Sequence, residues 1–330
     1  MVQRMIKNIF NNNSVLDSML DGLKYISNTF NKLSIWVKLI MCILILFVFV
    51  SNLKKNKKRM EGYENSDVFV FHDENVKIYD DFYVNVYDIL TYNQIKENYE
   101  VGEILNRTTP STQSIILDIG SGTGHVVADL ASQKLNVVGL DNSAAMIKKA
   151  KETYPDYNFK EGDALSASTF VDNSFTHILC LYFTIYYFKN KRTFFENCYT
   201  WLKPGGYLVI HLVNRDLFDP MLNAANPLIV LSPQRYAKDR ITKSKLVFDD
   251  FNYNANFVLD QKNNMATFVE KFENKDTGKT FRKNEHKMYM ETEEAILDIA
   301  QGVGFILQGK VDLMKAAYDY QYLYILTKPN

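Results

Sequence analysis

A glycine-rich segment that directly follows an apolar run places the strongest constraint on the fold. Residues 118–125 read DIGSGTGH, after the apolar residues Ile115–Leu117. Glycines at this spacing allow a tight turn and let a ligand approach the backbone with no Cβ in the way. A buried strand that ends in such a loop and continues into a helix is typical of α/β folds. NAD-binding folds use similar glycines, so the loop alone does not identify the ligand.

Strand and helix patterns alternate around this loop, which favours a parallel sheet. One or two helices rich in tyrosine are predicted within Tyr79–Asn106. Five strands are predicted at Ser114–Ile119, Asn136–Leu140, Asn158–Glu161, His177–Leu181 and Tyr207–Val213. The helices between them are predicted at Gly124–Gln133, Ser143–Thr153 and Thr193–Leu202.

The pattern changes after Asn214. Three runs have the alternation of antiparallel strands, at Lys245–Leu259, Met265–Glu273 and Lys279–Met290. A helix at Thr292–Gly302 and strands at Gly304–Val311 and Gln321–Thr327 follow. We therefore predict a Rossmann-like α/β fold: a seven-stranded, mostly parallel sheet with helices on both faces and an antiparallel β lid, about residues 215–290, inserted after strand five.

The spacing of the glycines separates two ligand classes. A dinucleotide loop has the pattern G-x-G-x-x-G, whereas here Gly124 comes one residue early and His125 occupies the expected place. The G-x-G-x-G pattern after Asp-Ile resembles motif I of class I methyltransferases that use S-adenosylmethionine (SAM). Glu161–Ala164 (EGDA) resembles the Gly-Asp-Ala motif after strand three, and Trp201–Tyr207 resembles the L-x-P-G-G turn before strand five.

This resemblance implies SAM as the cofactor and assigns residues to it. Asp141, 17 residues after Gly124, is expected to accept both ribose hydroxyls. Asp163 is expected to take the adenine amino group, and the backbone N–H of Ala164 a ring nitrogen. Met146 either rests on the adenine or is a core methionine, and Asp118 either serves the methionine amino group or caps the loop. The complete predicted set is Asp118, Gly120, Gly122, Gly124, Asp141, Asn142, Met146, Asp163, Ala164 and Cys180.

Three residues are predicted to act on the acceptor side. The segments around Tyr87 and Tyr99 resemble the N-terminal helix of small-molecule N-methyltransferases that act on amino sugars and glycine, which implies that Tyr87 closes over the methionine part of SAM. Tyr182 follows strand four, on the face where the family's acceptor enters. Arg282–His286 is a polar run in a strand pattern, either a solvated edge or a place where Glu285 or His286 orients the acceptor. The predicted catalytic residues are Tyr87, Tyr182 and His286.

Composition argues against other ligand classes. The 38 basic and 38 acidic residues balance, so no global field favours nucleic acid, and no motif of a DNA methyltransferase is present. The five histidines have no metal-ligand spacing, so no metal is expected. The three cysteines, Cys42, Cys180 and Cys198, do not suggest a disulfide framework.

An apolar run near the N-terminus predicts a membrane anchor. We divide the chain into a tail (residues 1–34), a transmembrane helix (35–53), a basic juxtamembrane segment and linker (54–78) and the methyltransferase domain (79–330). A buried core helix and a signal peptide are the alternatives. Five basic residues at 54–59 place the following domain in the cytoplasm by the positive-inside rule. The sequence thus predicts a single-pass membrane protein.

The predicted function is methyl transfer from SAM to a small molecule, through an amine or hydroxyl, or to a lipid. Two alternatives stay open, a protein or peptide methyltransferase and a catalytically silent scaffold with the same fold. An NAD dehydrogenase is disfavoured by the glycine spacing.

Overall fold

The computed structural model describes residues 34–41, 43–44, 69–225 and 232–330. The chain divides into two compact units, Met1–Arg59 and Met60–Asn330. In the first unit, residues 35–41 and 43–44 are helical. Most of the predicted span, 35–53, and the basic cluster at 54–59 lie outside the described residues. Within the described ranges, no helix combines the length and the hydropathy that crossing a membrane requires.

The second unit contains a mixed seven-stranded sheet in the order β11-β12-β6-β5-β2-β3-β4. Its strands are β2 (Ile115–Ile119), β3 (Asn136–Asp141), β4 (Asn158–Glu161), β5 (Phe175–Cys180), β6 (Leu202–Val213), β11 (Ile306–Asp312) and β12 (Gln321–Thr327). Strands β2 to β6 are parallel, and β12 runs antiparallel to both of its neighbours. The strand order reverses between β2 and β5, which is where open α/β sheets bind ligands, beyond the carboxyl ends of the strands.

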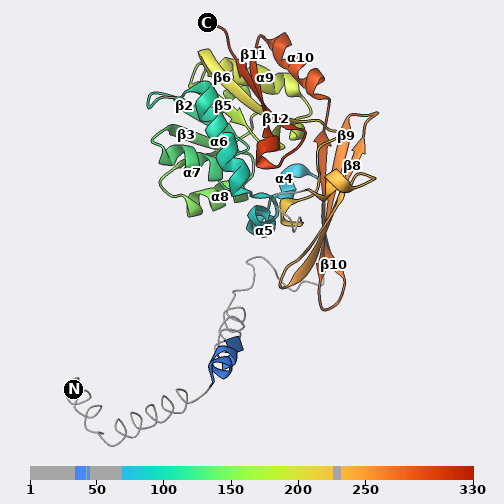
Figure 1. Ribbon diagram of the computed structural model, residues 1–330. Helices are drawn as coiled ribbons and strands as arrows, with labels where there is room; N and C mark the ends of the chain where they lie inside the picture. The colour runs from blue at the N-terminus through green and yellow to red at the C-terminus, as the bar shows by residue number, and fades with distance from the viewer. Residues whose placement is uncertain (1–33, 42, 45–68, 226–231) are drawn as a thin grey trace, which may run out of the picture. The chain divides into compact units, whose positions relative to one another are not determined.

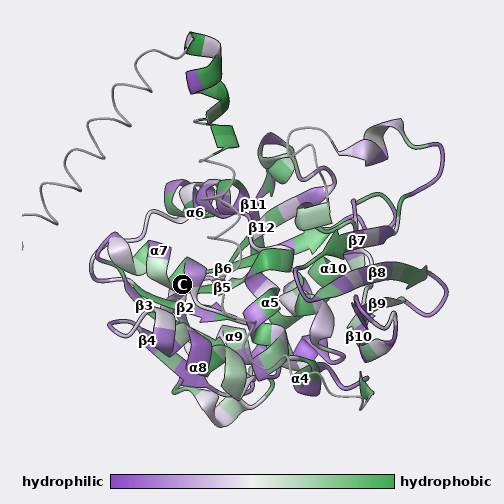
Figure 2. Ribbon diagram, turned by 90° about the horizontal axis from the view of Figure 1, so that it is seen from below, coloured by the Kyte–Doolittle hydropathy of each residue, from purple (hydrophilic) through white to green (hydrophobic). Residues whose placement is uncertain are grey.

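Helices cover both faces of this sheet. One face packs against α6 (Gln94–Thr108), α7 (His125–Ser132) and α8 (Ala144–Thr153), and the other against α9 (Lys191–Trp201) and α10 (Glu293–Val303). The central strands are almost entirely buried, and Figure 2 shows hydrophilic residues along outward helices such as α8. Short 3₁₀ helices complete the unit, at η1 (Ala167–Thr169), η2 (Thr184–Tyr187), η3 (Asn223–Ala225), η4 (Pro233–Tyr236) and η5 (Leu313–Ala316).

A second sheet has five strands where the sequence pattern predicts a lid of three. Its order is β1 (Val70–His72), β10 (Thr280–Tyr289), β9 (Met265–Asn274), β8 (Phe251–Asp260) and β7 (Lys243–Val247). The predicted strand Lys245–Leu259 is in fact two strands, because the chain turns at Asp249 and Asp250. Strand β1 and helix α4 (Asn75–Ile78) come from residues predicted to be linker. Three residues of β1 are too few to show a periodicity.

Helix α5 (Asp81–Thr91) joins the two sheets (Figure 1). Its apolar face, which includes Phe82 and Val86, packs against Phe251 and Phe272 of the five-stranded sheet. Asp80 caps the start of the helix, because its side chain accepts a hydrogen bond from the backbone N–H of Tyr83. This packing leaves a space inside the second unit. The space is closed by α5, the five-stranded sheet and the carboxyl ends of the parallel strands.

Candidate active site

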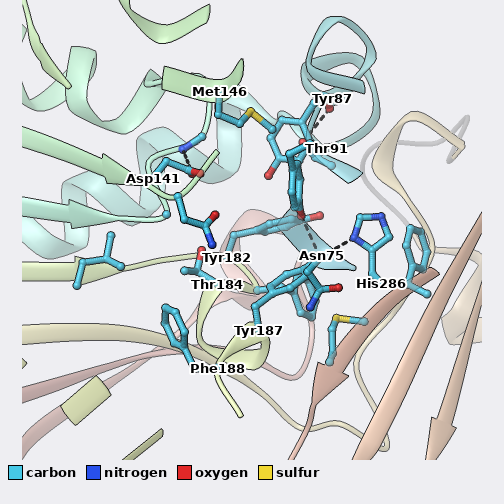
Figure 3. A pocket seen from close by; sticks show the side chains of 18 of the residues that line it. Asn75, Tyr87, Thr91, Asp141, Met146, Tyr182, Thr184, Tyr187, Phe188 and His286 are labelled. Atoms are coloured by element: carbon cyan, nitrogen blue, oxygen red, sulfur yellow. Dashed lines mark hydrogen bonds between the residues drawn. The ribbon is translucent and has the colours of Figure 1, made fainter. Parts of the chain in front are cut away.

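A cavity of about 440 Å³ occupies this space (Figure 3). It extends from the glycine loop and the end of β3 to the inner wall formed by α4, η2 and β10. Ten of the thirteen predicted site residues line it: Tyr87, Gly120, Gly122, Asp141, Asn142, Met146, Asp163, Ala164, Tyr182 and His286. The fold therefore brings the predicted cofactor and acceptor residues to one cavity, from segments up to about two hundred residues apart in the sequence.

The glycine loop lies at the cofactor end of the cavity. Gly120 has φ +73°, and a Cβ at this position would lie 2.5 Å from the Thr184 side chain, so only glycine fits. Gly122 has φ +54°, and a Cβ there would come 3.7 Å from the ring of Tyr87. The loop thus presents bare backbone to the cavity, as close approach of a nucleoside requires.

Asp141 ends β3 beside this loop. Its Oδ2 accepts a hydrogen bond of 3.0 Å from the backbone N–H of Gly122, and its Oδ1 one of 2.9 Å from that of Ser143. Burial raises the pKa of the Asp141 carboxyl, although these backbone donors oppose the shift. Each carboxylate oxygen has a further lone pair, so the pair can also accept two hydroxyl groups. These contacts fit the ribose of SAM.

Two further elements supply an apolar side chain and a carboxylate to the same cavity. Met146, in the first turn of α8, is buried, and its N–H is capped by the Ser143 hydroxyl at 3.1 Å. Asp163 follows β4, and its Oδ1 accepts a hydrogen bond of 2.8 Å from the N–H of Leu165. Ala164 is buried next to it. The apolar side chain and the acceptor carboxylate both line the cavity, as an adenine site needs.

Three predicted cofactor residues do not line this cavity. The side chain of Cys180 is completely buried in the core, where burial raises the pKa of its thiol, and its contact with the cofactor stays a prediction. A Cβ on Gly124 would lie 2.7 Å from the ring of Phe159, so this glycine allows the close approach of α7 to β4. Asp118 instead lines a second hollow of about 110 Å³ next to the loop.

The second hollow is rich in charged groups. It is lined by Asp118, Lys96, Glu97 and Glu100, and Lys96 Nζ lies 2.7 Å from Oε1 of Glu100. Burial and the nearby carboxylates of Glu97, Asp141 and Glu100 raise the pKa of Asp118. Burial also raises the pKa of Glu97, to about 7. The role predicted for Asp118 near the methionine amino group stays a prediction.

Tyr182 connects the two hollows, because it lines both. Its backbone has φ +52°, an unusual value for a residue with a side chain. The ring nitrogen Nδ1 of His211 bonds to the Tyr182 carbonyl, and Nε2 of His211 lies 3.1 Å from Oε1 of Gln321. His211 is fully buried, and burial lowers its pKa to about 3. A neutral imidazole therefore holds Tyr182 in its left-handed conformation.

His286 lies at the opposite end of the cavity from Asp141 (Figure 3). It is buried on the inner face of β10, so the solvated-edge interpretation of Arg282–His286 is wrong for this residue. Its Nε2 lies 2.8 Å from Oε2 of Glu270, and its Nδ1 lies 2.9 Å from the Tyr187 hydroxyl. Glu285 points to the other face of the strand, where it pairs with Lys283.

Sequence reasoning missed the partners of His286. Glu270 and Tyr187 belong to segments whose patterns indicate only strand and loop, and nothing in their spacing relates them to residue 286. A fully buried glutamate on an alternating strand is indistinguishable in sequence from one that faces solvent. Only the pairing of β9 with β10, and the docking of η2 beside them, brings the three side chains together.

Comparison with known proteins agrees with this geometry. Residues 117–210 match a family model described as a methyltransferase domain. The demethylmenaquinone methyltransferase of Renibacterium salmoninarum is 35% identical over 105 residues, which is 32% of this chain and 44% of that protein. Matches to the first relatives span between 40% and 44% of their lengths.

Residues 117–210 are thus similar to a methyltransferase domain. Solved structures share its fold. The CcbJ methyltransferase of Streptomyces caelestis is 16% identical, with a TM-score of 0.57 and coverage of 76% of this chain and 98% of that chain. A sugar N-methyltransferase from a Streptoalloteichus species is 15% identical, with a TM-score of 0.52 and coverage of 72% and 88%. The matched region, residues 117–210, includes the glycine loop and Asp141. Among the described residues, no cluster of side chains could hold a metal ion.

Proposed function

We propose that the chain transfers a methyl group from SAM to a small-molecule acceptor. One observation carries this proposal: a single cavity connects the predicted cofactor residues with the predicted acceptor residues. It begins at the carboxylate of Asp141, which two backbone N–H groups hold in place, and extends to the ionisable side chains around His286. A scaffold without activity would have no need for a second, polar end to its ligand cavity.

The residues of this chain mainly align the reactants and exclude water. SAM, when bound, supplies a methyl group that is activated by its sulfonium. Asp141 would hold the ribose, and Tyr87 and Tyr182 lie between the glycine loop and the acceptor wall, where they can enclose the transferring carbon (Figure 3). Alignment of nucleophile and leaving group can account for a large part of the barrier reduction in such displacements, on the order of 7–11 kcal/mol.

The size of the cavity supports a small acceptor over a protein. Its volume of about 440 Å³ lies within the usual range for small-molecule sites, about 300–1,000 Å³. The five-stranded sheet and α5 close it on two sides. The sugar N-methyltransferase and the demethylmenaquinone methyltransferase found by comparison both act on small molecules by their names, which is consistent with this class. A protein or peptide methyltransferase is the second candidate.

We also propose that the N-terminal segment tethers the domain to a membrane, with the domain on the cytoplasmic side. The described helical residues 35–41 and 43–44 support this, because their apolar side chains, such as Trp36 and Ile43, are exposed around the helix. Apart from Lys38 the described helical residues are apolar, and a helix with so little polar surface is usually covered by protein or lipid. The basic cluster at 54–59 supports the orientation. A lipid acceptor would be compatible with this placement.

Turnover tests the proposed function. The purified full-length protein is incubated with SAM and fractions of a small-molecule extract, and release of S-adenosylhomocysteine is measured. We expect release with at least one fraction, and none from Asp141→Ala. If the protein binds SAM but no fraction of small molecules, lipids or peptides supports turnover, the silent scaffold is the better explanation.

A further inference from the structure

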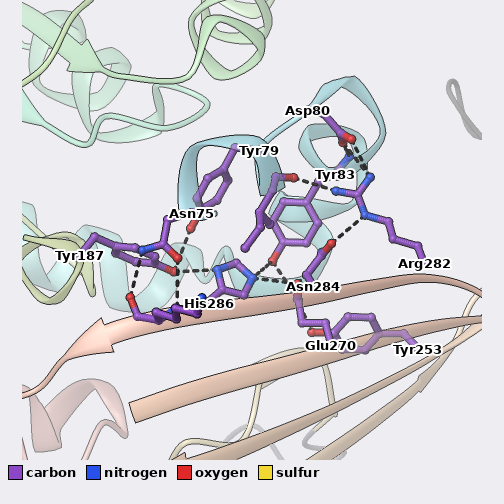
Figure 4. Close-up of polar contacts among 12 residues, drawn as sticks. Asn75, Tyr79, Asp80, Tyr83, Tyr187, Tyr253, Glu270, Arg282, Asn284 and His286 are labelled. Carbon is purple, nitrogen blue, oxygen red and sulfur yellow. Dashed lines mark hydrogen bonds and ion pairs between the residues drawn. The ribbon is translucent and has the colours of Figure 1, made fainter. Parts of the chain in front are cut away.

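We infer that Glu270, His286 and Tyr187 form a proton relay that accepts the proton of an acceptor hydroxyl, so that the acceptor is an alcohol or phenol on an apolar body. This inference rests on the proposed function and names the substrate class of the same cavity. Figure 4 shows the side chains involved, which come from β9, β10 and η2.

Glu270 is the fixed anion of the relay. Its side chain is completely buried and accepts four hydrogen bonds: Tyr83 and Tyr253 donate to Oε1 at 2.7 and 2.6 Å, and Asn284 and His286 donate to Oε2, both at 2.8 Å. Burial alone would raise the pKa of this carboxyl, but the His286 imidazole and the donated hydrogen bonds hold it below its ordinary value. Glu270 is therefore a carboxylate that cannot turn toward the cavity.

The nearest guanidinium does not neutralise this carboxylate. Arg282 is committed to Asp80, with Nη1 at 2.9 and 2.7 Å from the two carboxylate oxygens, and to the carbonyl of Ile78 at 2.8 Å. Arg282 reaches Glu270 only through Asn284, whose Oδ1 accepts from Nε at 2.9 Å. None of the four described donors to Glu270 is a lysine or arginine. Among these donors, the one that can become a cation is His286.

Glu270 fixes the tautomer of His286. Because a carboxylate only accepts, the Nε2 that faces it must carry the proton, and the neutral ring then has its lone pair on Nδ1. That lone pair faces the Tyr187 hydroxyl at 2.9 Å, so Tyr187 donates to it. Tyr187 in turn accepts a hydrogen bond of 3.0 Å from the Tyr79 hydroxyl. Every group in the chain then has a partner, and the donor direction runs from Tyr79 to His286.

The Tyr187 oxygen is the entry to the relay. A phenolic oxygen has two lone pairs, one of which Tyr79 uses, and Tyr187 lines the cavity. Burial raises the pKa of Tyr187 and of Tyr79, so both stay neutral and pass protons without storing a charge. Charge can accumulate only on His286, where the Glu270 carboxylate stabilises an imidazolium as the aspartate of a Ser-His-Asp triad does.

The proton and electron balance is complete. The acceptor O–H bond breaks, and its proton passes to the Tyr187 oxygen as the proton of Tyr187 moves to Nδ1 of His286. The oxygen lone pair forms the new C–O bond, and the bond between the methyl carbon and sulfur breaks with its electrons retained by sulfur. The proton left on His286 returns to solvent after product release.

The cavity wall around Tyr187 favours a hydroxyl on an apolar body. Next to the relay the wall is formed by the side chains of Phe188, Phe257, Phe268 and Met288. Glu270, the carboxylate paired with His286, lies behind that ring and has all its acceptor capacity used, so it is not available to an ammonium acceptor. A neutral O–H donor matches the neutral phenolic oxygen that the wall presents.

The experiment uses 4-nitrophenol as the probe, because its absorption spectrum separates phenol from phenolate. The full-length protein, saturated with S-adenosylhomocysteine, is titrated with the probe at a pH where the free probe is mostly protonated. The ionisation of the bound probe also depends on the charged and ionisable groups around His286. These groups are Glu270 on β9, Tyr253 on β8, Arg282 on β10, and Tyr79, Tyr83 and Tyr187. We expect wild-type protein to bind the probe as phenolate.

Glu270→Gln should reverse this result while keeping the shape of the side chain. We expect the ratio of bound phenolate to bound phenol to fall at least about tenfold, because the protonated ring of His286 would lose the carboxylate that lies 2.8 Å from its Nε2. Glu273→Gln is the matched control, since Glu273 lies on the opposite face of the same strand and should leave the ratio unchanged. Tyr187→Phe keeps the ring packing and should also bind the probe as neutral phenol. This variant tests the relay if the Glu270→Gln protein does not fold.

Two results would overturn the relay: wild-type protein that does not bind 4-nitrophenol, or that binds it with the same ionisation as Glu270→Gln and Tyr187→Phe. Calorimetry with SAM on the same samples separates the two claims. If SAM does not bind to wild-type protein, the proposed function fails; if SAM binds and the probe is not deprotonated, only the relay fails.

Discussion

The backbone N–H of Gly122 donates a hydrogen bond of 3.0 Å to Oδ2 of Asp141, and so joins the glycine loop after β2 to the carboxylate at the end of β3. The two residues are 19 positions apart: Gly122 lies in the loop after β2, and Asp141 is the last residue of β3. Since the other carboxylate oxygen is fixed by Ser143, Asp141 is oriented before any ligand arrives. A preorganised acceptor loses little entropy on binding.

Asp141→Ala should weaken SAM binding by roughly 2–4 kcal/mol, because two buried hydroxyls would lose a charged acceptor. Asp163→Ala should cost less, since the adenine would keep its backbone contact and its apolar wall. Isothermal calorimetry on both variants checks the order. Unchanged affinity in a folded Asp141→Ala protein would mean that the ribose binds elsewhere.

Two glycine-to-alanine changes should have opposite effects. Gly120→Ala places a Cβ 2.5 Å from the Thr184 side chain at a φ of +73°, so we expect loss of both stability and SAM binding. Gly102 lies within α6, where an added Cβ would meet no other atom within 4 Å, so Gly102→Ala should stabilise the protein by about 0.5–1 kcal/mol. Urea unfolding of both variants measures the difference, and a neutral Gly120→Ala would contradict the tight loop.

The burial of His211 leads us to expect that the stability of the fold decreases at acidic pH. Its pKa falls from 6.5 to about 3 on folding, because burial disfavours the charged ring. Between these two pH values the unfolded chain therefore binds more protons at this residue than the folded chain does. The contribution of neutral His211 to the free energy of unfolding is complete above about pH 6.5 and is lost as the pH falls toward 3. The loss in the free energy of unfolding is on the order of 5 kcal/mol. His211→Gln should flatten this part of the stability profile, whereas an equally steep profile would assign the acid sensitivity to other groups.

Glycosylation in microsomes tests the proposed orientation. Asn12 begins a sequon before the predicted anchor, and Asn106 begins one within α6, where Thr108 is buried. If the basic cluster keeps the domain in the cytoplasm, the protein gains at most one glycan, which Asn12→Gln abolishes and Asn106→Gln does not. A glycan on Asn106 would place the domain in the lumen. Absence of any glycan would remove the support for a spanning helix.

The parts of the site that follow from local sequence could be predicted, and the parts made by tertiary contact could not. The loop at Gly120–Gly124 and the carboxylate of Asp141 each end a strand with a strong apolar pattern, so position along the chain fixes their place at the sheet edge. Glu270 has no such signal, because its burial depends on β8, β10 and α5 packing around it. Cys180 also ends a strand, but its side chain packs in the core, so its contact with the cofactor stays a prediction.

Calorimetric titration of the full-length protein with SAM, S-adenosylhomocysteine and NAD tests the central claim most directly. The early third glycine, the fixed carboxylate of Asp141 and the position of Asp163 in one cavity predict binding of SAM and S-adenosylhomocysteine, with no heat from NAD. Binding of NAD without binding of SAM would contradict the account.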